Sequence, residues 1–413
     1  MTLIEMGQRA KEAARFLNTA GTFRKNDALF AMADALVTRA DLILAANEAD
    51  IAVARENGMS ESMLDRLTLT SERICAIADG VRAVAALPDP VGETLGEVRR
   101  PNGLRIAKRR VPLGVIGVIY EARPNVTADV AALCLKSSNA CILRGGKEAI
   151  SSNRAMAQVM AQALEEVGFP AGTVQLVEDT SRETATEMMR LNGYIDVLIP
   201  RGGAGLIQSV VQNATVPVIE TGTGNCHIYV DAECDPDMAV DIVINAKTSR
   251  PSVCNAAESL LIHKNAPVAF YEKMRTAFIQ KKVEVRGCPV ICDLWNEAIP
   301  ATEADFDTEF LDYMISVKTV NNIDEAIDHI NAHGTGHSEC IVTENYTNAE
   351  HFLDCVDAAA VYVNASTRFT DGNEFGFGAE IGISTQKMHA RGPMGLQELT
   401  TFKYIIRGNG QVR

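Results

Sequence analysis

The sequence lacks the features of membrane and secreted proteins. No apolar run reaches the roughly 20 residues of a membrane-spanning helix, and the N-terminus has no apolar core typical of a secretory signal. The chain has 10 cysteines but no Cys-x-x-Cys pair, which indicates reduced thiols rather than a disulfide framework. We therefore expect a cytoplasmic protein.

Motifs of nucleotide and metal sites are also missing. No Gly-x-Gly-x-x-Gly joins an apolar strand to a helix, and Gly376-Phe-Gly378 has no such context. His329, His333 and His337 recur at a spacing of four, but no His-Glu-x-x-His accompanies them. Glycines after His333 are expected to end a helix there, so the three side chains need not share a face. We expect no metal site.

The composition excludes a further class. The chain has 413 residues, of which 47% are hydrophobic, and this is enough for two or more domains with full cores. Its formal net charge is -14, which argues against a nucleic-acid-binding protein.

Apolar periodicity divides the chain into a helical start and a longer α/β part. Spacings of three and four predict helices at 3–17, 26–47 and 60–86. From residue 112 on, short apolar strands alternate with helices, as in parallel, doubly wound sheets. Strands are predicted at 115–119, 140–143, 174–176, 196–199, 217–219, 227–230, 260–263, 314–320, 339–342 and 360–363. Helices are predicted at 238–247, 267–280, 323–332 and 348–356, and from about 127, 148, 181 and 204 onward.

Two strand signals lie outside this α/β rhythm. Residues 95–111 alternate around Pro101-Asn102-Gly103, and Asn-Gly between alternating runs predicts a hairpin. Residues 402–406 form another isolated apolar run near the C-terminus. Because exposed strand edges need a cover, we expect the hairpin and this strand to pair across a subunit boundary. They would form an arm used in homo-oligomerisation.

One thiol lies where a nucleophile could act. Cys254, in Arg250-Pro-Ser-Val-Cys254, lies between a helical run and an apolar strand. Glu220 lies upstream of it in Glu220-Thr-Gly-Thr-Gly224, and Asn125 follows the strand at 115–119. A carboxylate can move protons, an amide can hold an oxyanion, and a thiol can attack. The three groups predict an acyl-transfer site.

The order and spacing of these groups resemble the aldehyde dehydrogenase superfamily. Within it, four stretches are similar to the γ-glutamyl phosphate reductase branch: Tyr120-Glu-Ala-Arg-Pro-Asn125, Arg250-Pro-Ser-Val-Cys254, Asn364-Ala-Ser-Thr-Arg-Phe-Thr-Asp-Gly372 and residues 320–341. The resemblance implies two doubly wound α/β domains plus a small β arm. It also implies NADPH-dependent reduction of L-glutamate 5-phosphate to glutamate 5-semialdehyde, through a Cys254 thioester. This reaction is the second step of proline synthesis.

The resemblance also implies a domain plan. Residues 1–94 and 112–222 would form the NADP-binding domain, 223–385 the catalytic domain, and 95–111 with 396–413 the oligomerisation arm. The implied cofactor residues are Arg144, Gly145, Gly146, Lys147, Gly202, Gly203 and Glu309. For the substrate, we expect the cations Arg123, Arg250 and Arg368 to pair with its phosphate or α-carboxylate, and His337 and Ser338, near a loop, to line its site. Lys147 stands where NAD-using relatives commonly carry an acid, which favours NADPH.

Several alternatives remain. A hydrolytic aldehyde dehydrogenase shares every core residue, and in such enzymes an acid at the Glu220 position activates water. A cysteine hydrolase could pair Cys254 with His227 or His263. A non-catalytic nucleotide-binding protein is the third. Because acyl phosphates are labile, a reductase would also be expected to contact the glutamate 5-kinase that makes its substrate.

Overall fold

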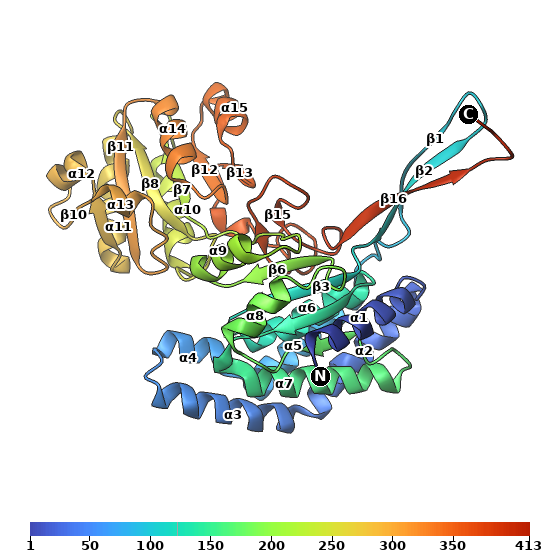
Figure 1. Ribbon diagram of the computed structural model, residues 1–413. Coiled ribbons are helices and arrows are strands. Elements are labelled where there is room, and N and C mark those ends of the chain that lie inside the picture. Colours follow the sequence, from blue (N-terminus) through green and yellow to red (C-terminus); the bar gives the residue numbers. More distant parts are fainter. Residues whose placement is uncertain (122) are drawn as a thin grey trace. The chain divides into compact units, whose positions relative to one another are not determined.

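The computed structural model describes residues 1–121 and 123–413, and these residues form two units (Figure 1). Unit 1 comprises Met1–Glu220, Gly376–Gly382 and Met394–Arg413. Unit 2 comprises Thr221–Phe375 and Ile383–Pro393. None of the helices in the described residues is both long and apolar enough to cross a membrane.

Unit 1 contains a parallel sheet whose described strands run in the order β5-β4-β3-β6. They are β3 (Val115–Tyr120), β4 (Ala140–Arg144), β5 (Val174–Leu176) and β6 (Val197–Arg201). Every residue of β3 is buried, as is typical of a parallel strand covered on both faces. The strand predicted at 217–219 is wrong, because Val218 forms only an isolated bridge to Leu198.

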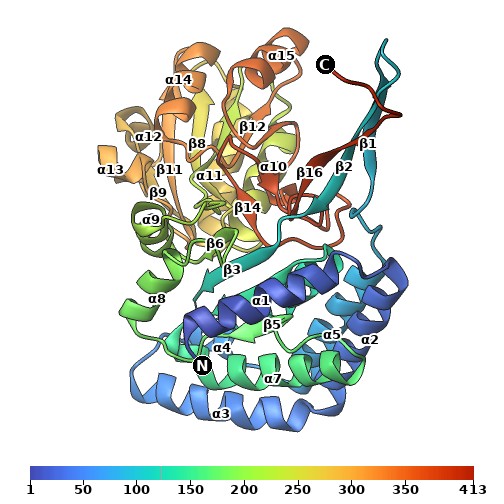
Figure 2. The ribbon, with the colours of Figure 1, turned by 45° about the vertical axis from the view of Figure 1, so that its right-hand side comes forward.

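Helices cover this sheet and extend beyond it (Figure 2). Helix α1 packs on β3, β4 and β5, α6 on β3 and β4, and α7 on β5. The helices are α1 (Leu3–Leu17), α2 (Thr22–Thr38), α3 (Ala40–Glu56), α4 (Glu61–Leu67), α5 (Ser71–Ala86), α6 (Pro124–Lys136), α7 (Ile150–Glu166), α8 (Arg182–Met189) and α9 (Ala204–Asn213). A short 3-10 helix, η1 (Lys147–Ala149), precedes α7.

Two of the long helices predicted near the N-terminus are each broken in two. The chain leaves helical geometry at Arg39, with φ -109 and ψ 22, so α2 and α3 replace one predicted helix. Residues 68–70 are extended between α4 and α5, and the Thr70 side chain accepts a hydrogen bond from the Arg73 N–H. Apolar periodicity continues across both breaks, which is why the sequence pattern did not reveal them.

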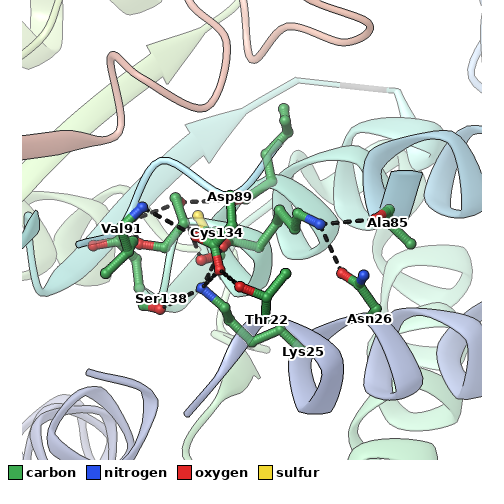
Figure 3. Close-up of polar contacts among 12 residues, drawn as sticks. Thr22, Lys25, Asn26, Ala85, Asp89, Val91, Cys134 and Ser138 are labelled. Atoms are coloured by element: carbon green, nitrogen blue, oxygen red, sulfur yellow. Dashed lines mark hydrogen bonds and ion pairs between the residues drawn. The ribbon is translucent and has the colours of Figure 1, made fainter. Parts of the chain in front are cut away.

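A buried ion pair connects helix α2 to the segment that follows α5 (Figure 3). Lys25 Nζ lies 2.6 Å from Asp89 Oδ2, and the two side chains are 1% and 8% exposed. The same ammonium donates to the Lys136 carbonyl and to Ser138 Oγ, so all three of its protons have acceptors. Thr22 Oγ1 and the Val91 N–H donate to the Asp89 carboxylate. Burial lowers the pKa of Lys25.

The arm is a narrow antiparallel sheet that projects from unit 1 (Figures 1 and 2). Its strands β1 (Thr94–Arg99), β2 (Arg105–Pro112) and β16 (Thr400–Arg407) run in the order β1-β2-β16. The predicted hairpin and C-terminal strand are confirmed. Their predicted pairing across a subunit boundary is wrong, because β16 pairs with β2 of the same chain.

Unit 2 has a parallel sheet with the described strand order β10-β9-β11-β8-β7-β12-β13. Its strands are β7 (Cys226–Val230), β8 (Ala257–His263), β9 (Glu284–Gly287), β10 (Ile299–Pro300), β11 (Met314–Val320), β12 (Ser338–Val342) and β13 (Ala360–Val363). Ile228 and Val230 of β7 face one apolar cluster with α10 and α11, whereas Tyr229 faces another with α14 and α15. The predicted strands of this sheet are confirmed, and the short strands β9 and β10 at one side of the sheet were missed.

The remaining elements of unit 2 connect these strands. Its helices are α10 (Pro236–Thr248), α11 (Val268–Lys281), α12 (Pro289–Leu294), α13 (Glu303–Phe306), α14 (Ile323–His333), α15 (Tyr346–Cys355) and the 3-10 helix η2 (Thr367–Phe369). Strands β14 (Ile383–Ser384) and β15 (Gly392–Pro393) form a small antiparallel pair. Helix α10 and strand β8 follow each other closely in the chain, and the segment between them carries Cys254.

Candidate active site

The segment between α10 and β8 holds Cys254 against the start of β7. Cys254 is half-buried, as a reactive thiol must be if substrate is to reach it. A Cβ at Gly224 would lie 1.4 Å from the Cys254 carbonyl oxygen, so only glycine allows this close approach. The Cys226 thiol donates to the same carbonyl over 3.2 Å. The backbone of the nucleophile is therefore held from the β7 side.

Asn255, the residue after the nucleophile, ties the segment to η2. Its Nδ2 donates to the Thr370 carbonyl over 3.0 Å, and its own carbonyl accepts from Thr367 Oγ1 over 2.7 Å. The side chain is 5% exposed. The sequence reasoning missed Asn255. Its position beside Cys254 was the available signal, but its partners lie more than 100 positions away in the chain.

Two arginines bring positive charge to the same segment. Arg368 Nε donates to Ser249 Oγ over 3.1 Å, and its Nη1 donates to Asn255 Oδ1. Burial, together with the charge of Arg250, lowers the pKa of Arg368. Within residues 1–121 and 123–413, neither guanidinium has a carboxylate at ion-pair distance. An anion close to Cys254 would relieve the repulsion between the two cations.

His337 and Ser338 lie beside Cys226, at the start of β7. Both side chains are fully buried. His337 Nδ1 lies 3.8 Å from Cys226 Sγ and 2.8 Å from Ser338 Oγ, which donates to Thr370 Oγ1 over 2.6 Å. Neither side chain presents accessible surface here, and their contact with substrate stays a prediction. They support Cys226 and Thr370.

Glu309 is connected to the nucleophile segment through Gly224. Its Oε1 accepts a hydrogen bond from the Gly224 N–H over 2.8 Å. Two residues later, Leu311 has φ 57, the left-handed region that a branched residue rarely adopts. The Leu311 N–H donates to Glu258 Oε1 over 3.2 Å. Glu258 was also missed by the sequence reasoning.

In unit 1, the expected oxyanion residue begins helix α6. Asn125 is exposed in the first turn, and Arg123 is the N-cap residue. Asn125 Nδ2 donates to Asp129 Oδ2 over 3.0 Å, one helical turn on. Burial raises the pKa of Asp129 to about 6. Glu220 lies at the last position of the first segment of unit 1.

The two residues that end β4 are used within unit 1. Arg144 Nη2 donates to the Thr180 carbonyl over 2.6 Å and to that of Ser181 over 3.1 Å, and burial lowers the Arg144 pKa. A Cβ at Gly145 would lie 2.1 Å from Asn153 Nδ2 on α7. Gly145 is thus required by packing against α7, and its role in the approach of a cofactor stays a prediction.

The next residues are more open. Gly146 is the N-cap of η1, with φ -64. Lys147 follows it and is exposed, and among the described residues it makes no hydrogen bond or ion pair. Among the cations that are expected to bind a phosphate, Lys147 is therefore the one that the described residues of unit 1 do not bind.

A second glycine pair begins helix α9. Gly203 is the N-cap, and a Cβ there would meet open space. Its N–H donates to Glu121 Oε2 over 3.1 Å. A Cβ at Gly202 would lie 2.6 Å from Glu121 Cδ. The N-terminus of α9 thus faces an exposed carboxylate, in the kind of place where helices bind anions.

The two histidines considered as bases for Cys254, His227 and His263, are placed as follows. His227 is fully buried with Nδ1 3.2 Å from Glu339 Oε2, and His263 lies at the far end of β8. The rings of His329 and His333 lie 4.3 Å apart, and burial lowers the pKa of His329 to about 2. Among the described residues, no group of three or more His, Cys, Asp and Glu side chains could hold a metal ion.

Comparison with known proteins agrees with this fold and these residues. The model of the aldehyde dehydrogenase family matches residues 4–287 and 306–405, and the chain belongs to that family. A gamma-glutamyl phosphate reductase of Clostridium perfringens is 62% identical over 411 residues, covering 100% of this chain and 99% of that protein. One of Heliobacterium modesticaldum is 59% identical over 407 residues, covering 98% of each.

A solved structure extends the comparison. The crystal structure of the gamma-glutamyl phosphate reductase of Thermotoga maritima matches with a TM-score of 0.98 and 50% identity, covering 100% of both chains. The aldehyde dehydrogenase-like fold expected from the sequence is confirmed. These relatives do not favour the hydrolytic alternative.

Proposed function

We propose that this protein reduces L-glutamate 5-phosphate to L-glutamate 5-semialdehyde and phosphate, with NADPH as the reductant. The relatives named gamma-glutamyl phosphate reductase, at 62% and 59% identity over nearly the whole chain, support this reaction. Unit 2 would carry the catalytic cysteine, and unit 1 would bind the cofactor. The observation that carries the proposal is the half-buried Cys254, whose backbone is held by Gly224 and Cys226.

The covalent step belongs to Cys254. Its thiolate attacks the acyl phosphate carbonyl, the carbon–oxygen bond to phosphate breaks, and inorganic phosphate leaves with that bond's electron pair. A thioester remains on the enzyme. NADPH, when bound, would supply the hydride that reduces the acyl carbon of the thioester to the aldehyde. The carbon–sulfur bond breaks, and its electron pair returns to the Cys254 thiolate. The backbone N–H of Cys254 and the Asn125 amide are the proposed oxyanion donors.

Arg250 and Arg368 are proposed to receive the anionic groups of the substrate. Both cations lack a carboxylate partner among the described residues, and Arg368 is held in place by Ser249 and Asn255. A guanidinium binds phosphate or carboxylate through paired, charge-assisted hydrogen bonds. Arg123 is a further candidate. Glu220 is proposed to carry protons rather than to activate water, because a reductase has no hydrolytic step.

NADPH is proposed because Lys147 is exposed and has no partner among the described residues. Its ammonium would pair with the 2′-phosphate, and Gly202 and Gly203 at the start of α9 would face the other phosphates. Glu309 is proposed to hold a ribose. Such a charge-assisted contact contributes on the order of 1.5–3 kcal/mol, or roughly 10- to 150-fold in affinity.

A binding titration tests this cofactor assignment. Lys147→Glu should weaken NADPH binding far more than NADH binding. Lys403→Glu, on strand β16 of the arm, is the matched charge control and should leave both affinities unchanged. Equal losses for NADPH and NADH in the Lys147 variant would show that this lysine does not read the 2′-phosphate.

A coupled assay tests the reaction itself. Glutamate 5-kinase would supply the acyl phosphate, and NADPH consumption and phosphate release would be followed together. One phosphate should appear for each NADPH oxidised, and the reverse reaction should require phosphate. Oxidation of the semialdehyde without phosphate would instead identify a hydrolytic dehydrogenase.

Two assemblies are proposed. Contact with the kinase would protect a labile acyl phosphate. Dilution of the coupled assay, in the presence of a nucleophile that traps free acyl phosphate, would reveal this contact. Homo-oligomerisation through the arm would cover the outer edges of β1 and β16, which remain unpaired among the described strands. Deletion of residues 400–413 should lower the sedimentation coefficient, and an unchanged oligomer would contradict this role.

A further inference from the structure

A second buried ion pair brackets the segment that carries Cys254. Lys247 lies in the last turn of α10 and Glu258 is the second residue of β8. Lys247 Nζ lies 2.5 Å from Glu258 Oε2, and both side chains are 0% exposed. The pair therefore closes the two ends of the intervening segment, 249–256, inside the unit.

The carboxylate has a second attachment. Its other oxygen, Oε1, accepts from the Leu311 N–H, and the Glu258 carbonyl accepts from Ser316 Oγ over 3.2 Å. Leu311 has φ 57, a conformation that must be held by its surroundings. The hydrogen bond to Glu258 is a contact that holds it.

These contacts form a closed circuit around the nucleophile. From Glu258 the circuit passes through Leu311 to Glu309, which binds the Gly224 N–H. Gly224 lies against the Cys254 carbonyl, and the segment then returns to Lys247 and Glu258. The two oxygens of one carboxylate thus join the nucleophile segment to residues 309–311.

We propose that Glu258 is a positioning residue, which with Lys247 holds the Cys254 segment and residues 309–311 in one fixed arrangement. Glu258 does not touch the reacting atoms. It acts through the placement of the Cys254 thiol and of Glu309. The inference rests on the proposed nucleophilic role of Cys254, but its first test does not depend on the reaction.

The first test measures the thiol itself. Alkylation of Cys254 by iodoacetamide, followed by mass spectrometry of its peptide, should differ from wild type by about 10-fold or more in Glu258→Gln, because the segment is no longer fixed. Asp89→Asn is the matched control, since it leaves the buried Lys25 of unit 1 without its counter-charge. It should leave the Cys254 rate within about 2-fold, as expected for a distant site.

The second test separates catalysis from binding. Glu258→Gln should lower kcat by about 10- to 100-fold, while the affinity for NADPH falls less, because misplacement of reacting groups affects chemistry most. Glu258→Asp keeps the charge with a shorter reach and should restore part of kcat.

The double variant Lys247→Met/Glu258→Gln tests whether the effects of Glu258→Gln arise only from lost stability. It removes both charges, so the protein should regain stability relative to Glu258→Gln alone. The positioning role requires that alkylation and kcat stay abnormal in this stable variant. A wild-type alkylation rate and kcat in the double variant would overturn the proposal. An equal change of the Cys254 alkylation rate in Asp89→Asn would also overturn it. Loss of all turnover in wild type with normal alkylation would count against the proposed reaction instead.

Discussion

A buried lysine–carboxylate pair occurs in each unit, and the two pairs differ in what else the lysine can reach. Lys25 of unit 1 has Asp89, a backbone carbonyl and Ser138 Oγ as acceptors. Lys247 of unit 2 has one described acceptor, Glu258. The first ammonium keeps hydrogen-bond acceptors even if its counter-charge is lost, whereas the second does not.

The environment of the two carboxylates differs in the same direction. Asp89 accepts from Thr22 and the Val91 N–H as well as Lys25. Burial raises the pKa of Glu258 to about 7, although Lys247 opposes the shift. One pair is a saturated structural anchor. The other is a sparsely bonded pair beside a reactive segment, which is why we assign a positioning role only to the second.

The largest expected effect is on turnover, and it comes from removal of the Cys254 thiol. Of the two pairs, only Lys247–Glu258 supports the segment that carries this thiol. Cys254→Ala should reduce turnover by at least about 10⁴-fold, since no other group replaces a lost covalent nucleophile. Binding of NADPH, measured by titration, should change little. Asp89→Asn should retain the wild-type turnover per folded molecule. Turnover of Cys254→Ala above a few per cent of wild type would contradict the covalent mechanism.

Neutralising each carboxylate should next show the difference in stability. Glu258→Gln should lower the free energy of unfolding of unit 2 by about 5 kcal/mol, and Asp89→Asn should lower that of unit 1 by about 3 kcal/mol. The single tryptophan, Trp295, reports unfolding of unit 2 by fluorescence, and circular dichroism follows the whole chain. Equal losses of unfolding free energy in the two variants would mean that the extra acceptors of Lys25 do not contribute to stability.

The pH dependence of the unit 2 pair should be visible as well. Because the folded pKa of Glu258 is about 7, above the ordinary 4.5, its contribution is full below pH 4.5 and is lost as pH rises through 7. As pH rises between these limits, the free energy of unfolding of wild type should therefore fall relative to that of Glu258→Gln. Urea unfolding at pH 5, 6 and 7, followed through Trp295, measures it; a constant difference between the two proteins would refute it.

The smallest effect concerns a buried base that has no counter-charge. Since the folded pKa of His329 is about 2 and the ordinary value 6.5, its contribution is present above pH 6.5 and is lost as pH falls. Wild type should lose about 2 kcal/mol more than His329→Gln between pH 7 and pH 5. The glutamine can still accept from Lys318, which lies 3.3 Å from His329 Nδ1. Parallel pH profiles would show that His329 does not titrate on unfolding.

Much of the fold could be predicted because local patterns follow the layers. The strand Val115–Tyr120 is an apolar run buried at every residue, and helix Ile323–His333 carries one apolar face. The break at Arg39 and the short strand Glu284–Gly287 were not predicted. A continuing apolar pattern conceals a break, and a strand of 4 residues is too short to show a period.

The candidate site divides in the same way. The junction that carries Cys254, between a helix and a strand, follows from residues within about ten positions of it. Two hydrogen bonds that support this junction join distant residues. Asn255 and Thr370 are 115 positions apart, and Glu258 and Leu311 are 53 positions apart. The burial of His337 and Ser338 was not visible in the sequence either.

The sequence alone determined the class of fold and the family of chemistry, and it predicted Cys254 as the nucleophile, because periodicity and residue type are local properties. Only the tertiary structure decided that Glu258 and Lys247 face each other, that Gly145 is needed by Asn153, and that β16 pairs within its own chain. Those facts depend on which groups the packed chain brings opposite one another. Burial then sets the free energy of each contact, because a charge or donor removed from water must find its partner inside the protein.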